Sequence, residues 1–429
     1  MKFNVIEHRL NNGLLVLCME DHTSPAISYQ VHYAVGTRNE KPGIIGISHL
    51  FEHLMFRGSK ELGPEEISRI IQSNGGSINA FTSKDNTSFF ENLPSDKLEL
   101  AIRLEAERLE HLALDQENLD MEREVVRDER KLRIVNSPYG LVDEQLYLTA
   151  FDQHPYQWPI IGFDSNLVGM TLDDCRKFYR TYYAPNNSVV VIVGDIQPDK
   201  AIGLVEKYYG HLARQEPPEP LRSIERSQRG EKRVLFKKVS RVEAMFAGFH
   251  IPGIKDEETI ALIALSTILS SGKSSRFYGK FIQPGRVIEV GTSAGFPPFI
   301  SMDPGLFELI AIAPLKTDIA SLEMEIYAEI DKIKEDGPSE DEVSKAKKQL
   351  KSATIRLIQT QFNKGLIIGI GQIRSGDCNY LHYFLEKLAS LSCEKIKEVA
   401  AAYLTADNRT VVRLMPVPEE ESAQLGQLL

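Results

Sequence analysis

The sequence predicts an α+β fold of two tandem homologous domains, each a mainly antiparallel sheet packed with helices. Three observations indicate this fold: an order of elements that recurs in the two halves, a linker between the halves, and a repeated closing segment. In each half of the 429-residue chain, strand-like segments come first and amphipathic helical segments follow. Separate runs of strands and helices are typical of α+β proteins and not of a doubly wound parallel sheet.

The linker is rich in proline and charge. Residues 214–222 read RQEPPEPLR, and a polar stretch continues to Lys232. Clustered prolines and charges neither continue a helix nor bury an apolar face. We therefore expect an N-terminal domain over residues 1–215, a linker over 216–232 and a C-terminal domain over 233–429.

The closing segment of the first half recurs in the second. Residues 182–190 read YYAPNNSVV, and residues 403–411 read YLTADNRTV at a constant offset. Each segment joins the end of a helix to a β-branched strand. We interpret the match as the trace of a duplicated α+β unit.

Individual elements follow from periodicity and end signals. Alternating apolar residues predict strands over 14–20 and 27–35 and a strand or hairpin over 77–90, and helical spacing predicts helices over 44–57, 64–73 and 97–112. In the second half, Ser339 and Glu342 form a capping box, which predicts the start of a long helix.

Composition excludes several classes of protein. The net charge is −10 and no basic face is visible, which argues against nucleic-acid binding. The four cysteines are scattered, so we expect reduced thiols. No signal or transit peptide and no apolar run long enough for a bilayer is visible. We expect a cytoplasmic protein without membrane insertion.

The segment HLFEH, from His49 to His53, carries the clearest chemistry. On a helix, the two histidines lie four positions apart and project from one face, with Glu52 on the same face. Two imidazoles suit zinc, and a catalytic zinc site needs three protein ligands and a water. Glu52 is the candidate general base for that water. The other eight histidines are interpreted as ordinary surface or core residues.

Spacing alone does not identify a third ligand. Residues 121–129, MEREVVRDE, are acidic and helical in pattern, and glutamates on such a helix usually face solvent. Glu122 and Glu129 are seven positions apart and share one face, so both remain candidates to point inward.

These motifs resemble the pitrilysin/insulinase metallopeptidases, in particular half-size bacterial members and the zinc-bearing subunit of the mitochondrial processing peptidase. The resemblance rests on residues 49–53, on residues 122–129 and on GGSINAFT at 75–82. It implies one Zn²⁺ per chain with Glu129 as third ligand, and Glu122 orienting a ligand histidine. It also implies that substrate adds as a strand along residues 77–82, with Asn79 and Ala80 nearest the scissile bond.

The resemblance further implies a clam-shell of two such chains around a chamber. Active members carry an Arg-x6-Tyr pair that clamps substrate, whereas this chain has Ile282 and Glu289 where the pair is expected. We therefore expect a heterodimer with a paralogue that carries the clamp and a degraded zinc motif. A homodimer remains the alternative.

We expect hydrolysis of peptides or unfolded segments. Precursor processing is an alternative within the same chemistry, and a non-catalytic scaffold or assembly subunit is an alternative of the same fold. Nucleotide binding is excluded: Gly272-Lys273-Ser274 imitates the end of a phosphate loop, but Thr267 stands where that loop needs glycine.

Overall fold

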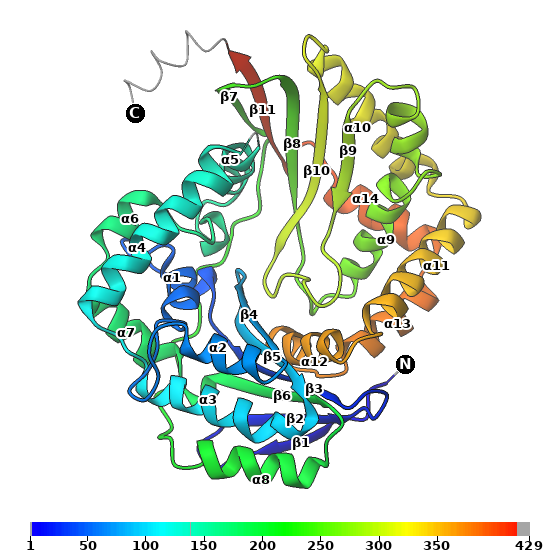
Figure 1. Cartoon of the computed structure of the whole chain (residues 1–429). Helices are drawn as coiled ribbons and strands as arrows, with labels where there is room; N and C mark the ends of the chain where they lie inside the picture. Colours follow the sequence, from blue (N-terminus) through cyan, green and yellow to red (C-terminus); the bar gives the residue numbers. More distant parts are fainter. Residues whose placement is uncertain (1, 138, 418–429) are drawn as a thin grey trace. The chain divides into compact units, whose positions relative to one another are not determined.

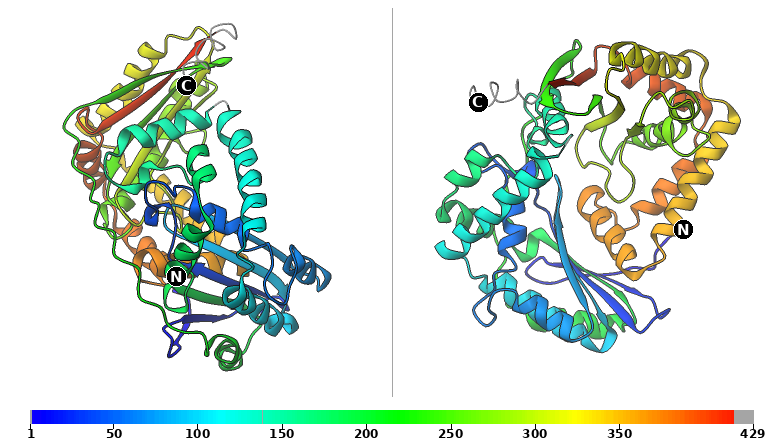
Figure 2. Two further views of the ribbon diagram at one scale, coloured as in Figure 1. Left: turned by 90° about the vertical axis from the view of Figure 1, so that its left-hand side faces the viewer. Right: turned by 45° about the horizontal axis from the view of Figure 1, so that its top comes forward.

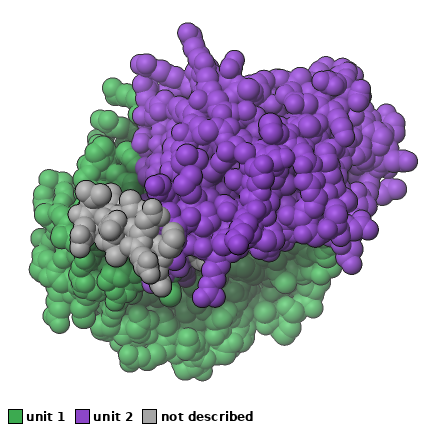
Figure 3. All heavy atoms as spheres, turned by 90° about the horizontal axis from the view of Figure 1, so that it is seen from above, with its two compact units in different colours: residues 1–132, 158–223, 355–383 green, residues 133–157, 224–354, 384–429 purple. Residues whose placement is uncertain are grey.

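The computed structural model describes residues 2–137 and 139–417, and the chain forms two compact units (Figure 1). The first unit contains residues 1–132, 158–223 and 355–383, and the second contains residues 133–157, 224–354 and 384–429 (Figure 3). Both are discontinuous in sequence. The domain boundaries expected at the linker stay a prediction.

The first unit is built on a six-stranded sheet of order β1-β2-β6-β3-β5-β4. Its strands are β1 (Ile6–Arg9), β2 (Leu15–Glu20), β3 (Ala26–Tyr33), β4 (Ser77–Thr82), β5 (Thr87–Pro94) and β6 (Ser188–Gly194). β2 and β6 are parallel, and the other pairs are antiparallel. β4 therefore lies at one edge, and the predicted hairpin over 77–90 is formed by β4 and β5.

Helices pack on both faces of this sheet (Figure 2). α3 and α8 pack on one face, and α12 lies against β3 and β6 on the other. The helices of the unit are α1 (Ile47–Leu54), α2 (Glu66–Ser73), α3 (Leu98–His111), α4 (Gln116–Arg130), α6 (Asp164–Gly169), α7 (Leu172–Tyr182), α8 (Pro198–Tyr209) and α12 (Gln361–Ser375). The three helices predicted from the first half correspond to α1, α2 and α3.

The second unit repeats the sheet of the first. Its strand order is β7-β11-β8-β10-β9. The strands are β7 (Lys232–Val239), β8 (Val242–Ile251), β9 (Glu289–Ser293), β10 (Gly305–Pro314) and β11 (Arg409–Val417). β11 pairs with β7 in parallel and with β8 antiparallel, as β6 pairs with β2 and β3.

The helices of the rest of the chain complete the α+β pattern. α5 packs against β7, β8 and β11, where its Leu146 joins the apolar core of the second unit. These helices are α5 (Gly140–Ala150), α9 (Glu258–Ser270), α10 (Ile319–Asp336), α11 (Glu340–Leu357), α13 (Tyr380–Ser390) and α14 (Cys393–Tyr403). The predicted capping box starts α11, because Ser339 and Glu342 hydrogen-bond each other's backbone N–H groups. Among the described residues, no helix has the length and apolar character needed to cross a bilayer.

The repeated closing segment performs the same task in both units. The Asn187 side chain donates to the Tyr182 carbonyl at 2.8 Å, and the Asn408 side chain donates to the Tyr403 carbonyl at 2.8 Å. Each asparagine thereby ties the end of a helix to the start of the strand that follows. The matched sequence therefore corresponds to matched hydrogen bonding and matched topology.

On the sheet face beneath α12, β3 carries buried polar side chains. His32 is fully buried and hydrogen-bonds Ser88 at 2.7 Å and Gln30 at 3.1 Å. α12 approaches closely because it has glycine there: a β-carbon on Gly369 would lie 2.2 Å from the His32 ring. Burial lowers the pKa of His32 to about 3, so its imidazole is neutral in the folded protein.

The pKa of His32 predicts how acid affects the first unit. Below its ordinary pKa of 6.5, His32 takes up a proton only when the unit unfolds, so acidification favours unfolding. Between pH 6.5 and 3, this histidine lowers the free energy of unfolding by up to ~1.4 kcal/mol per pH unit. His32→Asn removes that dependence. Urea unfolding at pH 7, 6 and 5, followed by fluorescence of the single tryptophan, Trp158, measures the slope.

His22→Asn is the opposite control. The hydrogen bond that His22 Nδ1 donates to Asp195 raises the pKa of the exposed His22, so this histidine favours the folded state as pH falls. Its removal should therefore steepen the acid dependence that His32→Asn flattens. Equal slopes in the His32 variant and the unsubstituted protein would show that His32 titrates freely in the folded state.

Candidate metal centre

α1 presents two imidazoles on one side and buries its other side. Phe51 of α1 is buried and stacks between Phe178 and Tyr179 of α7 at centroid distances of 5.7 Å. The opposite side of the helix carries His49 and His53, whose ring centroids lie 4.9 Å apart. The i, i+4 spacing thus brings the two rings together, as predicted.

α4 supplies the carboxylates that face α1. Its N-terminus is capped by Asp115, which accepts the Asn118 N–H at 2.9 Å. Glu122 is 3% exposed and Glu129 is half-buried, and both point toward α1. The common inward face expected for these two glutamates is therefore present.

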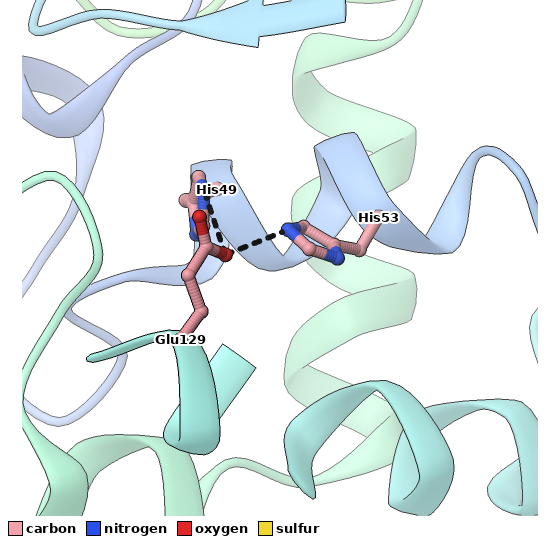
Figure 4. Close-up of side chains that lie close together, drawn as sticks. All are labelled: His49, His53 and Glu129. Carbon is pink, nitrogen blue, oxygen red and sulfur yellow. Dashed lines mark ion pairs between the residues drawn. The ribbon is translucent and has the colours of Figure 1, made fainter. Parts of the chain in front are cut away.

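The two glutamates contact different atoms. Glu129 Oε2 lies 3.2 Å from His53 Nε2 and 3.7 Å from His49 Nε2 (Figure 4). Glu122 Oε2 instead lies 3.1 Å from His53 Nδ1. Glu129 therefore lies close to both histidines, whereas Glu122 contacts only His53, at the ring nitrogen on the other side.

Glu122 fixes the protonation of His53. Burial opposes its charge, but hydrogen bonds from His53 and Arg57 outweigh burial and lower the pKa of Glu122. For His53, burial likewise opposes the charged form, and Glu122 outweighs it and raises the pKa. An ionised Glu122 only accepts hydrogen bonds, so His53 Nδ1 carries a proton. In the neutral ring, Nε2 then carries the lone pair, on the side that faces Glu129.

Arg57 is a site residue that the sequence reasoning missed. Its guanidinium donates to Glu122 Oε1, the carboxylate oxygen that His53 does not use. The available signal was its position, one helical turn beyond His53 on the same face. Arg57, Glu122 and His53 thus form a continuous chain of charge-assisted hydrogen bonds.

Glu52 lies on α1 but outside the close cluster. Within the described ranges 2–137 and 139–417, His49, His53 and Glu129 form the group whose nitrogen and oxygen atoms all lie within 4.8 Å of one another. Glu52 is half-buried, and its charge contributes to raising the pKa of His53. Glu52 therefore lies near enough to influence His53 electrostatically without belonging to this group.

β4 lies beside the cluster as an edge strand in contact with α1. Asn79 is exposed and Ala80 half-buried, and the Ala80 N–H donates to the Asn79 side chain at 2.9 Å. Among described residues, β4 pairs only with β5, so its other edge offers backbone groups for a further strand. Ile282 and Glu289 belong to the second unit, where Ile282 ends a π-helical turn and Glu289 begins β9.

The donor set fits zinc. Two imidazole nitrogens and one carboxylate oxygen are the protein ligands of a common type of catalytic zinc site, which leaves a fourth position for water. The three come from two packed helices, and the second partner of His53 is a carboxylate, as in many zinc proteins.

Comparisons with known proteins show which family the chain resembles. The insulinase (peptidase family M16) model matches residues 15–163, and the M16 peptidase inactive-domain model matches residues 169–350. The chain is 30% identical over 411 residues to the zinc protease PqqE of Helicobacter pylori, covering 95% of this chain and 92% of that protein.

Two solved structures extend the comparison. A protease from Helicobacter pylori has a TM-score of 0.92 at 29% identity, over 96% of this chain and 100% of that one. The periplasmic protease PqqL from Escherichia coli has a TM-score of 0.75 at 18% identity, over 99% of this chain but 49% of that one. The matched family models and the 30% identity to a relative covered over 92% of its length lead to one conclusion: this chain belongs to the M16, or insulinase, family of peptidases.

Proposed function

We propose that this chain is a zinc-dependent endopeptidase subunit whose metal ligands are His49, His53 and Glu129. The observation that carries the proposal is the meeting of two imidazoles and one carboxylate within 4.8 Å, with Glu122 holding the second nitrogen of His53. The first half of the chain, which holds this cluster, matches the insulinase model.

Each side chain then has a defined task in peptide hydrolysis. Zinc, when bound, lowers the pKa of a water and polarises the substrate carbonyl. Glu52 takes the proton of the attacking water on its carboxylate and passes it to the leaving amine. Glu122 keeps the proton of His53 on Nδ1, so Nε2 remains available as a ligand.

The proposal separates ligands from the base. His49→Ala and Glu129→Gln should each abolish stoichiometric zinc binding, because two protein donors remain. Glu52→Gln should retain one zinc per chain and lose on the order of 10²–10⁴-fold in kcat, the usual worth of general acid–base catalysis. Metal analysis and cleavage of a quenched fluorescent peptide measure the two effects.

Glu124→Gln, on the exposed face of α4, is the matched control and should change neither metal content nor rate. Chelator should remove activity and zinc should restore it. A protein that never takes up zinc, although it folds, would favour the alternative of a non-catalytic scaffold or assembly subunit. The match of residues 169–350 to the inactive-domain model is the observation behind that alternative.

The substrate is proposed to be a peptide or unfolded segment that adds as a strand to β4, with Asn79 and Ala80 beside the scissile bond. Strand addition uses backbone hydrogen bonds more than side chains. N-methylation of a peptide amide next to the scissile bond should therefore lower kcat/KM by about tenfold or more, since one lost hydrogen bond in a dry site costs about that factor.

Alanine substitution at the same peptide position is the control and should cost much less. A larger loss of kcat/KM from the alanine than from the N-methyl group would mean that pockets, and not the strand edge, hold the substrate.

A marked preference for one defined cleavage point in a folded precursor would favour precursor processing. The likeness to the mitochondrial processing peptidase and a cytoplasmic location stay predictions.

We also propose that activity needs a paralogous partner with an Arg/Tyr substrate clamp. The chain covers 49% of the structure of PqqL, so that longer protein has room for two such folds. In the position expected for the clamp, this chain has Ile282 and Glu289. The purified, zinc-loaded chain should therefore cleave peptides poorly, and addition of the paralogue should raise kcat/KM. Full activity in a homodimer would contradict the need for a paralogue.

A further inference from the structure

α1 begins without a capping side chain of its own. The residue before its first turn is Gly46, whose φ of 97° lies in the left-handed region. A β-carbon on Gly46 would lie 2.7 Å from the Gly162 Cα, so close packing also requires glycine. Serine, threonine, aspartate and asparagine, which usually cap helices, are excluded from this position.

Glu40 supplies the missing cap from six residues upstream. Its Oε2 accepts the Gly46 N–H at 2.8 Å, and its Oε1 accepts the Ser48 N–H at 2.9 Å. The Glu40 side chain is buried, with the residue 4% exposed. A carboxylate at the positive end of a helix dipole also stabilises the first turn electrostatically.

Backbone hydrogen bonds fix the segment that carries Glu40. The Glu40 N–H donates to the Thr37 carbonyl, and the Arg38 N–H donates to the Lys84 carbonyl in the β4–β5 turn. The carboxylate therefore reaches α1 from a segment tied to the main sheet.

The first turn of α1 contains a proposed ligand. α1 is only eight residues long, and His49 is its third residue. Short helices fray at their ends unless their free N–H groups are satisfied. His53 lies one turn further and is held separately by Glu122, whereas the direction of His49 depends on the first turn.

We propose that Glu40 is a positioning residue that locks the first turn of α1, so that His49 faces His53 and Glu129. The inference rests on the proposed zinc site and adds a residue outside the metal-binding motif. Glu40 touches neither the metal nor the substrate. It acts on the ligand geometry through the Gly46 and Ser48 amides.

The test compares Glu40→Gln, Glu40→Asp and the unsubstituted chain at pH 8, above the pKa of about 7 that burial gives Glu40. Glutamine replaces one accepting oxygen with an NH₂ group, which cannot accept an amide N–H. Glu40→Gln should weaken zinc binding about tenfold or more in chelator competition, the lower end for loss of an outer-shell partner. Aspartate keeps the charge but is shorter, and should give an intermediate affinity.

Cobalt(II) provides a readout of geometry. In the Glu40→Gln protein, the visible absorption of bound Co²⁺ should shift and weaken, because a displaced His49 changes the coordination. Circular dichroism and Trp158 fluorescence establish that each variant is folded before metal is added.

Thr360→Ala is the matched control. Thr360 caps α12 in the same unit by accepting the Asn363 N–H at 3.1 Å, and α12 packs on the sheet away from α1. This variant should lose comparable stability and keep its zinc affinity and cobalt spectrum. Equal zinc affinity and spectra in Glu40→Gln and the unsubstituted chain would overturn the role of Glu40. Absence of zinc binding by the unsubstituted chain would instead overturn the proposed function.

Discussion

The pairing of α4 carboxylates with α1 imidazoles is the interaction on which the site depends. Glu122 is buried and Glu129 is half-buried, and an unpaired buried charge costs several kcal/mol. The charge of Glu122 is compensated by the hydrogen bonds that it accepts from His53 Nδ1 and Arg57. Glu129 faces the Nε2 atoms of both histidines, where the proposed zinc ion would supply the positive charge. These contacts hold α1 and α4 against each other, and they bring the Nε2 atoms of both histidines close to Glu129.

The sequence permits prediction of one side of this site and not of the other. The histidines of α1 follow from helical spacing alone, because both lie on one continuous element. The third donor comes from a second helix, and no local pattern tells which of two glutamates on one face meets both rings. Which glutamate meets both rings depends on the position of α4 along the axis of α1, and that position is set by tertiary packing. Arg57 and Glu40 were missed because no motif marks their contacts: Arg57 donates to Glu122 on another helix, and Glu40 accepts from the backbone amides of Gly46 and Ser48.

For the fold as well, local features were predictable from the sequence and long-range packing was not. The α+β class, the main strands of the first sheet and the repeated closing segment were predicted and are confirmed, because they rest on local periodicity and turn chemistry. The assignment of residues 355–383 to the first unit was not foreseen. Periodicity reports which side of a helix is buried but not which sheet covers it. The close approach of α12 to the sheet depends on Gly365 and Gly369, which lie against Gln30 and His32.

The late position of α12 has a consequence for how the protein is made. The first sheet is complete once β6 has left the ribosome, but its cover begins at Gln361. Residues 195–360 are synthesised in between, which takes on the order of ten seconds at ~5–20 residues per second. During that interval the uncovered face presents Ser28, Gln30 and His32 of β3 beside Val189, Val191 and Val193 of β6, with which they pair. These valines therefore stay open to water until α12 has been synthesised.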